Sequence, residues 1–200
     1  MKLMSKTVEF FFDLGSPASY LAHTQLPDLC RDAGAELVYR PMLLGAVFQA
    51  TGNASPAMIP AKGRYMLRDL ARFAERYGVP MRFNPHFPIN TLTLMRLLVA
   101  VQLYQPERFD DALQALFRAI WVDGVNMGDP AKVAGVLVAA GFDAVALQAQ
   151  IAEPTVKDAL KATTEEAVKR GVFGAPTCFV GGEMFFGQDR LDFVREALRG

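Results

Sequence analysis

Cysteine is scarce in this sequence of 200 residues, with copies only at positions 30 and 178. The two do not form a C-x-x-C pair, and no histidine stands at metal-ligand spacing from either, so neither a redox motif nor a metal site is indicated. Because free cysteine is among the residue types most often buried, we expect Cys30 and Cys178 to be buried free thiols.

An excess of charge is also missing, because 21 Lys and Arg residues balance 21 Asp and Glu residues. A chain with a pI near 6.7 lacks the positive field that phosphate backbones and anionic membranes select for. The longest apolar stretch, residues 133–142, is far shorter than the roughly 20 residues that a membrane-spanning helix needs. We therefore expect no nucleic-acid partner and no membrane partner.

A secretory signal is absent as well. Residues 1–6 lead directly into a strand-like segment, without the apolar segment and small-residue cleavage site of a signal peptide. A cytoplasmic location follows by default. Hydrophobic residues make up 52% of the chain, which is enough for a sizeable core, and the length suits one domain or two closely packed lobes.

The beginning of the chain predicts a β-α-β unit. Residues 7–12 are rich in β-branched and aromatic side chains, which is typical of a buried strand. A helix is expected over 17–33, with Ser16 as N-cap, Pro17 at the first helical position and Gly34 as the stop. Residues 36–39 form a second short strand, which would normally lie parallel to the first.

The end of the chain predicts the order α-β-β-α. A helix over 155–170 ends at Gly171, and the strand-like segments 177–180 and 183–186 are separated by only Gly181 and Gly182. Two glycines between two strands are a strong hairpin signal. A last helix is expected over about 190–198, with Asp189 as its candidate N-cap.

The middle of the chain contains helical patterns and little strand character. Helices are expected over 62–77, over 92–104 and from Pro130 to about Gly141. Because the few strands at the two ends need partners, the simplest arrangement pairs the ends with each other. We therefore predict a discontinuous β-containing domain, residues 1–40 and 155–200, with an inserted helical domain over 41–154.

A β-α-β unit followed by α-β-β-α, with an X-Pro step before the hairpin, resembles the thioredoxin fold. The residues that carry the resemblance are 12–19, which read FDLGSPAS, and 174–177, which read GAPT. Thiol-disulfide oxidoreductases of that fold open the first helix with C-P-x-C, where this chain has Ser16-Pro17-Ala18-Ser19. A hydroxyl at a helix N-terminus remains, and unpaired N–H groups there stabilise an anion such as a ligand thiolate.

Further segments narrow the resemblance to 2-hydroxychromene-2-carboxylate isomerases and the related kappa-class glutathione transferases. The match covers nearly the whole chain in order. Gly15 is the one minor departure from the family pattern, since relatives frequently have a larger residue at this position. The segments are FFDLGSP at 11–17, GN at 52–53, IPAKGRYM at 59–66, FPINT at 87–91 and FGQDRL at 186–191.

The resemblance implies a glutathione-dependent enzyme in which the Ser16 hydroxyl hydrogen-bonds the glutathione sulfur and favours its thiolate. A free thiol has a pKa of about 8.5, and donors at a helix N-terminus can lower that value. On the local pattern alone Ser16 is an N-cap and nothing more. A capping role and a thiolate-donor role can coexist.

Other site residues are implied by the same resemblance. Ala175-Pro176 is similar to the cis-proline element, in which Ala175 offers its backbone to an extended peptide, although an ordinary trans loop proline is the alternative. Asp189, with Gln188, would hold the γ-glutamyl end of glutathione, where a carboxylate pairs with the α-ammonium group. Asp189 could instead only cap the last helix.

Asn53 and Lys62 lie in a loop that leads into a helix. The family match implies that Asn53 contacts the cysteinyl or glycyl backbone of glutathione and that Lys62 attracts a carboxylate, while a solvated lysine is the alternative for Lys62. His86, in a Pro-rich connection, has no partner for a nucleophile-base pair and is interpreted as structural. His23 is interpreted as a packing residue of the first helix.

The favoured function is interconversion of a 2-hydroxychromene-2-carboxylate-like aromatic acid and its ring-opened trans-benzylidenepyruvate form, with glutathione as cofactor and no metal. A kappa-class-like transferase or peroxidase uses the same thiolate and stays open. A third hypothesis is a disulfide oxidoreductase or a non-catalytic thiol-peptide binding module. The lack of C-x-x-C weighs against the oxidoreductase. The resemblance alone implies a homodimer in aromatic degradation.

Overall fold

The sheet of this protein joins the two ends of the chain, as predicted. The computed structural model describes residues 6–199, so residues 1–5, on which the expected absence of a secretory signal rests, lie outside the described residues. The four strands β1 (Thr7–Phe12), β2 (Glu36–Pro41), β3 (Thr177–Val180) and β4 (Glu183–Phe186) are ordered β2-β1-β3-β4. β1 pairs with β2 in parallel and with β3 antiparallel, and β3 and β4 form the expected hairpin.

Strand β1 is central and is covered on both faces. Phe10 and Phe12 belong to the main hydrophobic core, whereas Phe11 packs with Phe179 in a second, smaller core on the opposite face. All three phenylalanine side chains are fully buried, which explains why the strand reads as a continuous apolar run. β2 continues to Pro41, because a strand at the edge of the sheet tolerates a proline.

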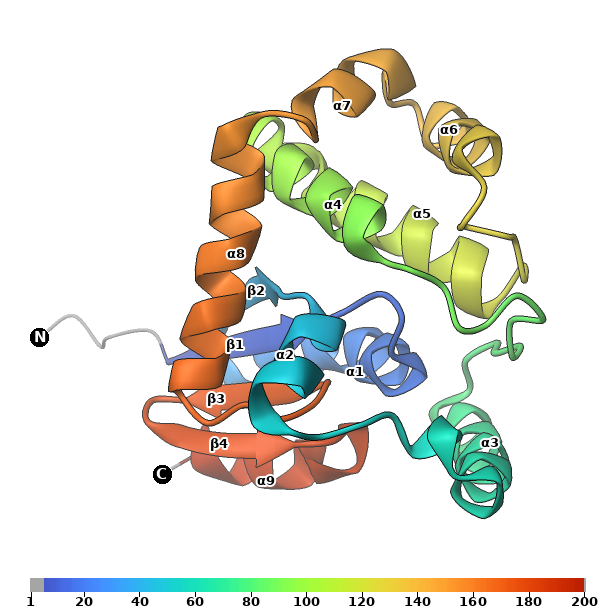
Figure 1. Cartoon of the computed structure of the whole chain (residues 1–200). Helices are drawn as coiled ribbons and strands as arrows, with labels where there is room; N and C mark the ends of the chain where they lie inside the picture. The colour runs from blue at the N-terminus through green and yellow to red at the C-terminus, as the bar shows by residue number, and fades with distance from the viewer. Residues whose placement is uncertain (1–5, 200) are drawn as a thin grey trace, which may run out of the picture.

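Helices and short 3-10 turns make up most of the rest of the described chain (Figure 1). The predicted helices over 17–33, 62–77, 92–104 and 155–170 are confirmed within two residues, whereas α2, α5 and α7 had no individual prediction. The helices are α1 (Pro17–Ala33), α2 (Leu44–Thr51), α3 (Pro60–Tyr77), α4 (Leu92–Tyr104), α5 (Phe109–Trp121), α6 (Pro130–Ala139), α7 (Ala144–Gln150), α8 (Pro154–Lys169) and α9 (Leu191–Ala197), with the turns η1 (Pro56–Met58), η2 (Pro106–Arg108) and η3 (Gln188–Arg190).

The fold is thioredoxin-like, with helices inserted after the β-α-β unit. Figure 1 shows α4 to α7 stacked away from the sheet, and α8 running from these helices back to the strands. The main core continues from β1 into α4, α5 and α7 without a break. The inserted helices therefore share buried surface with the sheet, and the boundaries at 40/41 and 154/155 stay predictions.

The predicted signals at the ends of α1 are confirmed. Ser16 is the N-cap, Pro17 occupies the first helical position, and Gly34 adopts a left-handed conformation with φ of 62°. The last helix, α9, is confirmed within one residue at each end, but its N-cap is Arg190, and Asp189 lies within η3. Asp189 is therefore not the cap of α9.

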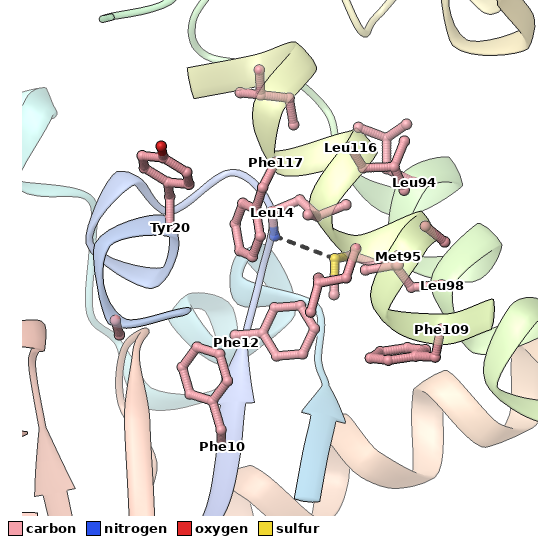
Figure 2. Packing of buried hydrophobic residues seen from close by; sticks show 14 of the residues in the cluster. Phe10, Phe12, Leu14, Tyr20, Leu94, Met95, Leu98, Phe109, Leu116 and Phe117 are labelled. Carbon is pink, nitrogen blue, oxygen red and sulfur yellow. Dashed lines mark hydrogen bonds between the residues drawn. The ribbon is translucent and has the colours of Figure 1, made fainter. Parts of the chain in front are cut away.

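The turn between β1 and α1 is held by the inserted helices through Leu14. The Leu14 N–H points at the Met95 sulfur at 3.4 Å (Figure 2), and the Leu14 carbonyl accepts a 2.8 Å hydrogen bond from the Trp121 indole. All three residues are fully buried. Both polar groups of the Leu14 backbone thus depend on α4 and α5, and Ser16 follows two residues later.

Within residues 6–199, no helix combines the length and the apolarity that a bilayer crossing requires.

We predict that Met95→Leu destabilises the fold by about 1 kcal/mol, because leucine retains the volume but removes the sulfur acceptor of the buried Leu14 N–H. Urea denaturation measures the change in the free energy of unfolding. Met127→Leu is the matched control, since Met127 is also buried and accepts no hydrogen bond within the described chain. Equal losses in both variants would exclude a contribution from the sulfur acceptor.

Candidate active site

Ser16 stands where β1 has ended and α1 begins, and its hydroxyl makes two hydrogen bonds. Oγ accepts from the Ser19 N–H at 3.1 Å and donates to the Ala175 carbonyl at 3.0 Å. The side chain is buried, with 5% of its surface exposed. Ser16 therefore caps α1 and also contacts the loop before β3, so capping describes only half of its contacts.

The Ala175–Pro176 peptide bond is cis, as the resemblance implied. The Ala175 carbonyl oxygen of this bond accepts a hydrogen bond from the Ser16 hydroxyl. The Ala175 N–H has no hydrogen-bond acceptor within residues 6–199. An unpaired backbone donor beside the serine hydroxyl suits a ligand that carries a carbonyl or an anion.

The turn η3 is attached to this loop through one backbone hydrogen bond, from the Gly187 N–H to the Pro176 carbonyl at 3.0 Å. Gly187 has a φ of 105°, and a Cβ there would lie 2.6 Å from Asp189 Oδ1. Glycine is therefore required for the Asp189 carboxylate to fold back over the turn. These contacts bring Ser16, Ala175, Pro176 and η3 together.

The two predicted η3 residues differ in exposure. The Asp189 carboxylate is partly exposed and pairs with Arg190 of the same turn. Gln188 is buried, and the Tyr77 hydroxyl contacts both its backbone oxygen, at 3.0 Å, and its side-chain Oε1, at 2.9 Å. Asp189 can meet a ligand from solvent, whereas one face of the Gln188 amide is already bonded to α3.

Asn53 and Lys62 differ in how the structure places them. Asn53 lies after α2, and its Nδ2 donates to the Phe173 carbonyl at 2.8 Å, two residues before Ala175. Lys62 is exposed in the first turn of α3, and no contact within the described residues brings it to Ser16. The structure therefore joins Asn53 to the loop before Ala175, whereas no contact within the described residues joins Lys62 to the site.

Asp13 is a buried residue of this region that the sequence analysis missed. Its Oδ1 accepts from the Gly15 N–H, and its Oδ2 accepts from the Leu44 N–H and from the Thr91 hydroxyl. Burial raises the pKa of this carboxyl above 3.8, and the three hydrogen bonds oppose that shift. An acidic residue directly after a buried strand was the available signal.

Both cysteines are buried and free, and both lie in the main core. Burial raises the pKa of the Cys30 thiol to about 11 and raises the pKa of Cys178 as well, so neither is a thiolate at neutral pH. Between Lys6 and Arg199, no group of three His, Cys, Asp or Glu side chains is arranged to hold a metal ion.

Neither histidine contacts the serine. His23 packs as predicted, with its ring stacked on Phe117 at a centroid distance of 5.2 Å, and His86 is exposed on the loop before α4. His23, Tyr20 and Phe117 line a cavity of about 360 Å³ between α1 and α5. None of the predicted site residues lines this cavity.

The fold and the Ser16-Pro17-Ala18-Ser19 turn define a thioredoxin-fold protein without the redox cysteine pair. A family model for the DSBA-like thioredoxin domain matches residues 7–199. The chain is 36% identical over 198 residues to 2-hydroxychromene-2-carboxylate isomerase of Sphingobium xenophagum, which covers 98% of this chain and 99% of that protein. It is 32% identical over 207 residues to glutathione S-transferase kappa 1 of Homo sapiens, which covers 98% and 92%.

Solved structures agree with these similarities. A structure of 2-hydroxychromene-2-carboxylate isomerase superposes with a TM-score of 0.85 at 30% identity, over 96% of this chain and 94% of the other. A probable DsbA oxidoreductase of Streptomyces coelicolor has a TM-score of 0.73 at 21% identity, over 96% and 88%, and shares the fold. This chain belongs to the DSBA-like family and, within it, to the group of 2-hydroxychromene-2-carboxylate isomerases and kappa-class glutathione transferases.

We predict that His23 makes the stability of the fold sensitive to acid. Burial lowers its pKa from 6.5 to about 4, so the neutral ring is favoured in the folded state. The contribution of the neutral His23 ring to the free energy of unfolding is complete above pH 6.5 and is lost as the pH falls toward 4. Relative to His23→Phe, the wild type should lose about 2 kcal/mol more between about pH 7 and pH 5.

Urea denaturation at several pH values measures this difference. The second histidine supplies the control, because His86→Gln removes an exposed imidazole and should leave the wild-type pH dependence in place. A His23→Phe profile parallel to that of the wild type would refute the prediction.

Proposed function

We propose that the protein is a glutathione-dependent isomerase that interconverts 2-hydroxychromene-2-carboxylate, or a similar aromatic acid, and trans-o-hydroxybenzylidenepyruvate. The observation that supports this most directly is the buried Ser16 hydroxyl, held at the start of α1 against the cis-proline loop. One relative, at 36% identity, bears the name of such an isomerase, and another, at 32% identity, bears the name of a kappa-class glutathione transferase.

The residues of the site suit glutathione. The unpaired Ala175 N–H offers a donor to a peptide carbonyl, and the partly exposed Asp189 carboxylate offers an acceptor to an α-ammonium group. Asn53, fixed against Phe173, lies near the same loop, and Lys62 would attract a carboxylate by its charge. When bound, glutathione would supply a thiolate that adds reversibly to an unsaturated carbon, allows rotation and leaves again, with no net redox change.

Ser16 would stabilise that thiolate by turning its hydroxyl hydrogen from the Ala175 carbonyl to the sulfur. Its oxygen would keep the hydrogen bond from the Ser19 N–H, which polarises the hydroxyl and makes it a better donor. The positive end of α1 acts in the same direction. The proposed role of the protein is therefore to position the sulfur and to favour its charged form.

A kappa-class-like transferase or peroxidase is the second candidate, supported by the human relative. It would consume glutathione, whereas the isomerase returns the full amount after many turnovers, so a glutathione balance separates the two. Binding without any turnover would favour a thiol-peptide binding module. The homodimer, the role in aromatic degradation and the cytoplasmic location stay predictions.

We predict that Ser16→Ala lowers turnover of 2-hydroxychromene-2-carboxylate by about 100-fold, the typical effect of removing one donor to a charged reacting atom. The ultraviolet band of glutathione thiolate, titrated with protein at neutral pH, should weaken in the same variant. Ser19→Ala is the matched control, because the buried Ser19 hydroxyl has no hydrogen-bond partner among residues 6–199 and the variant keeps the backbone N–H that binds Ser16.

Circular dichroism establishes that both variants are folded. Unchanged turnover in Ser16→Ala would remove Ser16 from the mechanism. A wild-type protein that neither binds glutathione nor shows a thiolate band would refute the glutathione-dependent function altogether.

A further inference from the structure

Tyr77 is the last residue of α3, and its side chain connects the inserted helices to the turn η3. Its hydroxyl lies 3.0 Å from the backbone oxygen and 2.9 Å from the side-chain Oε1 of Gln188. Both atoms of Gln188 are hydrogen-bond acceptors, so the single hydroxyl hydrogen of Tyr77 is shared between them in a bifurcated hydrogen bond. The contact therefore fixes both the backbone and the side chain of Gln188 from outside the sheet.

The fixed amide has one hydrogen-bonding group left. Gln188 has 5% of its surface exposed, and its Nε2 makes no hydrogen bond within the described residues. A buried amide without its partners is costly, so Gln188 keeps this orientation as long as Tyr77 holds Oε1. The side chain is thus left with N–H donors, which suit a carboxylate.

Asp189, the residue after Gln188, carries a negatively charged hydrogen-bond acceptor where Gln188 offers donors. The Asp189 carboxylate follows directly in η3 and is folded back over Gly187. Burial and the negative charge of Asp189 raise the pKa of the Tyr77 hydroxyl, which keeps it protonated and able to donate at neutral pH. An amide donor and a carboxylate on adjacent residues match the carboxylate and the ammonium group of an amino-acid end.

We propose that Tyr77 is a positioning residue that holds Gln188 and Asp189 in the arrangement that recognises the zwitterionic γ-glutamyl end of glutathione. This inference rests on the proposed function, because it concerns the ligand of the same site. Tyr77 itself does not touch the ligand. It acts through Gln188, while Ser16 on the other side of the Pro176–Gly187 hydrogen bond retains its own contacts.

The test compares two thiol ligands with two tyrosine variants by isothermal titration calorimetry. Glutathione has the γ-glutamyl end, and cysteinylglycine lacks it. Tyr77→Phe should weaken glutathione binding about tenfold, the effect of one lost hydrogen bond of about 1.4 kcal/mol, and should leave cysteinylglycine binding unchanged. Tyr65→Phe is the matched control, since Tyr65 lies on the same helix and its hydroxyl, within the described residues, hydrogen-bonds only Asp69, at 3.4 Å.

In the kinetic assay, Tyr77→Phe should raise KM for glutathione about tenfold and leave kcat at saturating glutathione unchanged, which a general loss of structure would not do. Should Tyr77→Phe not fold, Gln188→Met tests the same contact from η3, with the same expected selectivity for glutathione over cysteinylglycine. Equal weakening of both ligands, or no change for either, would overturn the role of Tyr77. Absence of glutathione binding to the wild type would overturn the proposed function and this role together.

Discussion

The buried carboxylate of Asp13 is the constraint on which the arrangement of this site depends. Its two oxygens accept hydrogen bonds of 2.8 Å from Gly15, 2.8 Å from Leu44 and 3.1 Å from Thr91. These donors belong to the turn before α1, to the start of α2 and to the residue before α4. A buried carboxylate left without donors costs several kcal/mol, so the three segments are held together or the fold is strongly destabilised.

The inserted helices also hold the turn that carries Ser16. Ser16, the loop before β3 and η3 carry most of the groups proposed to meet a ligand, Asn53 and Lys62 of the inserted segment carry the others, and the inserted helices also supply side chains that hold these groups in place. Met95 and Trp121 bind the backbone of Leu14, and Tyr77 binds Gln188. Because catalysis by a positioned donor would tolerate little displacement, we expect the inserted helices to influence the proposed site through these contacts.

Local sequence signals predicted most of the fold, because its elements begin and end at residues with one physical meaning. Ser16 with Pro17, Gly34 and the Gly181-Gly182 pair marked the ends of α1 and the turn of the hairpin, and the Phe-rich run marked the central strand. The resemblance supplied the cis Ala175–Pro176 bond. The contacts of Asp13 and Tyr77 could not be predicted, since their partners lie 78 and 111 residues away in the chain.

The wrong expectation for Asp189 also arises from contacts that the local sequence pattern does not show. Asp189 matched the residue type of an N-cap, but Gly187 lets its carboxylate fold back into η3, and the helix begins later. Tyr65 and Tyr77 lie on the same helix, yet Tyr65 is 58% exposed and Tyr77 reaches a buried amide. Periodicity places residues on a face, and only tertiary contacts decide what that face meets. A substitution of Tyr77 in the inserted helices is therefore expected to change the proposed recognition of the γ-glutamyl end while the contacts of Ser16 stay in place.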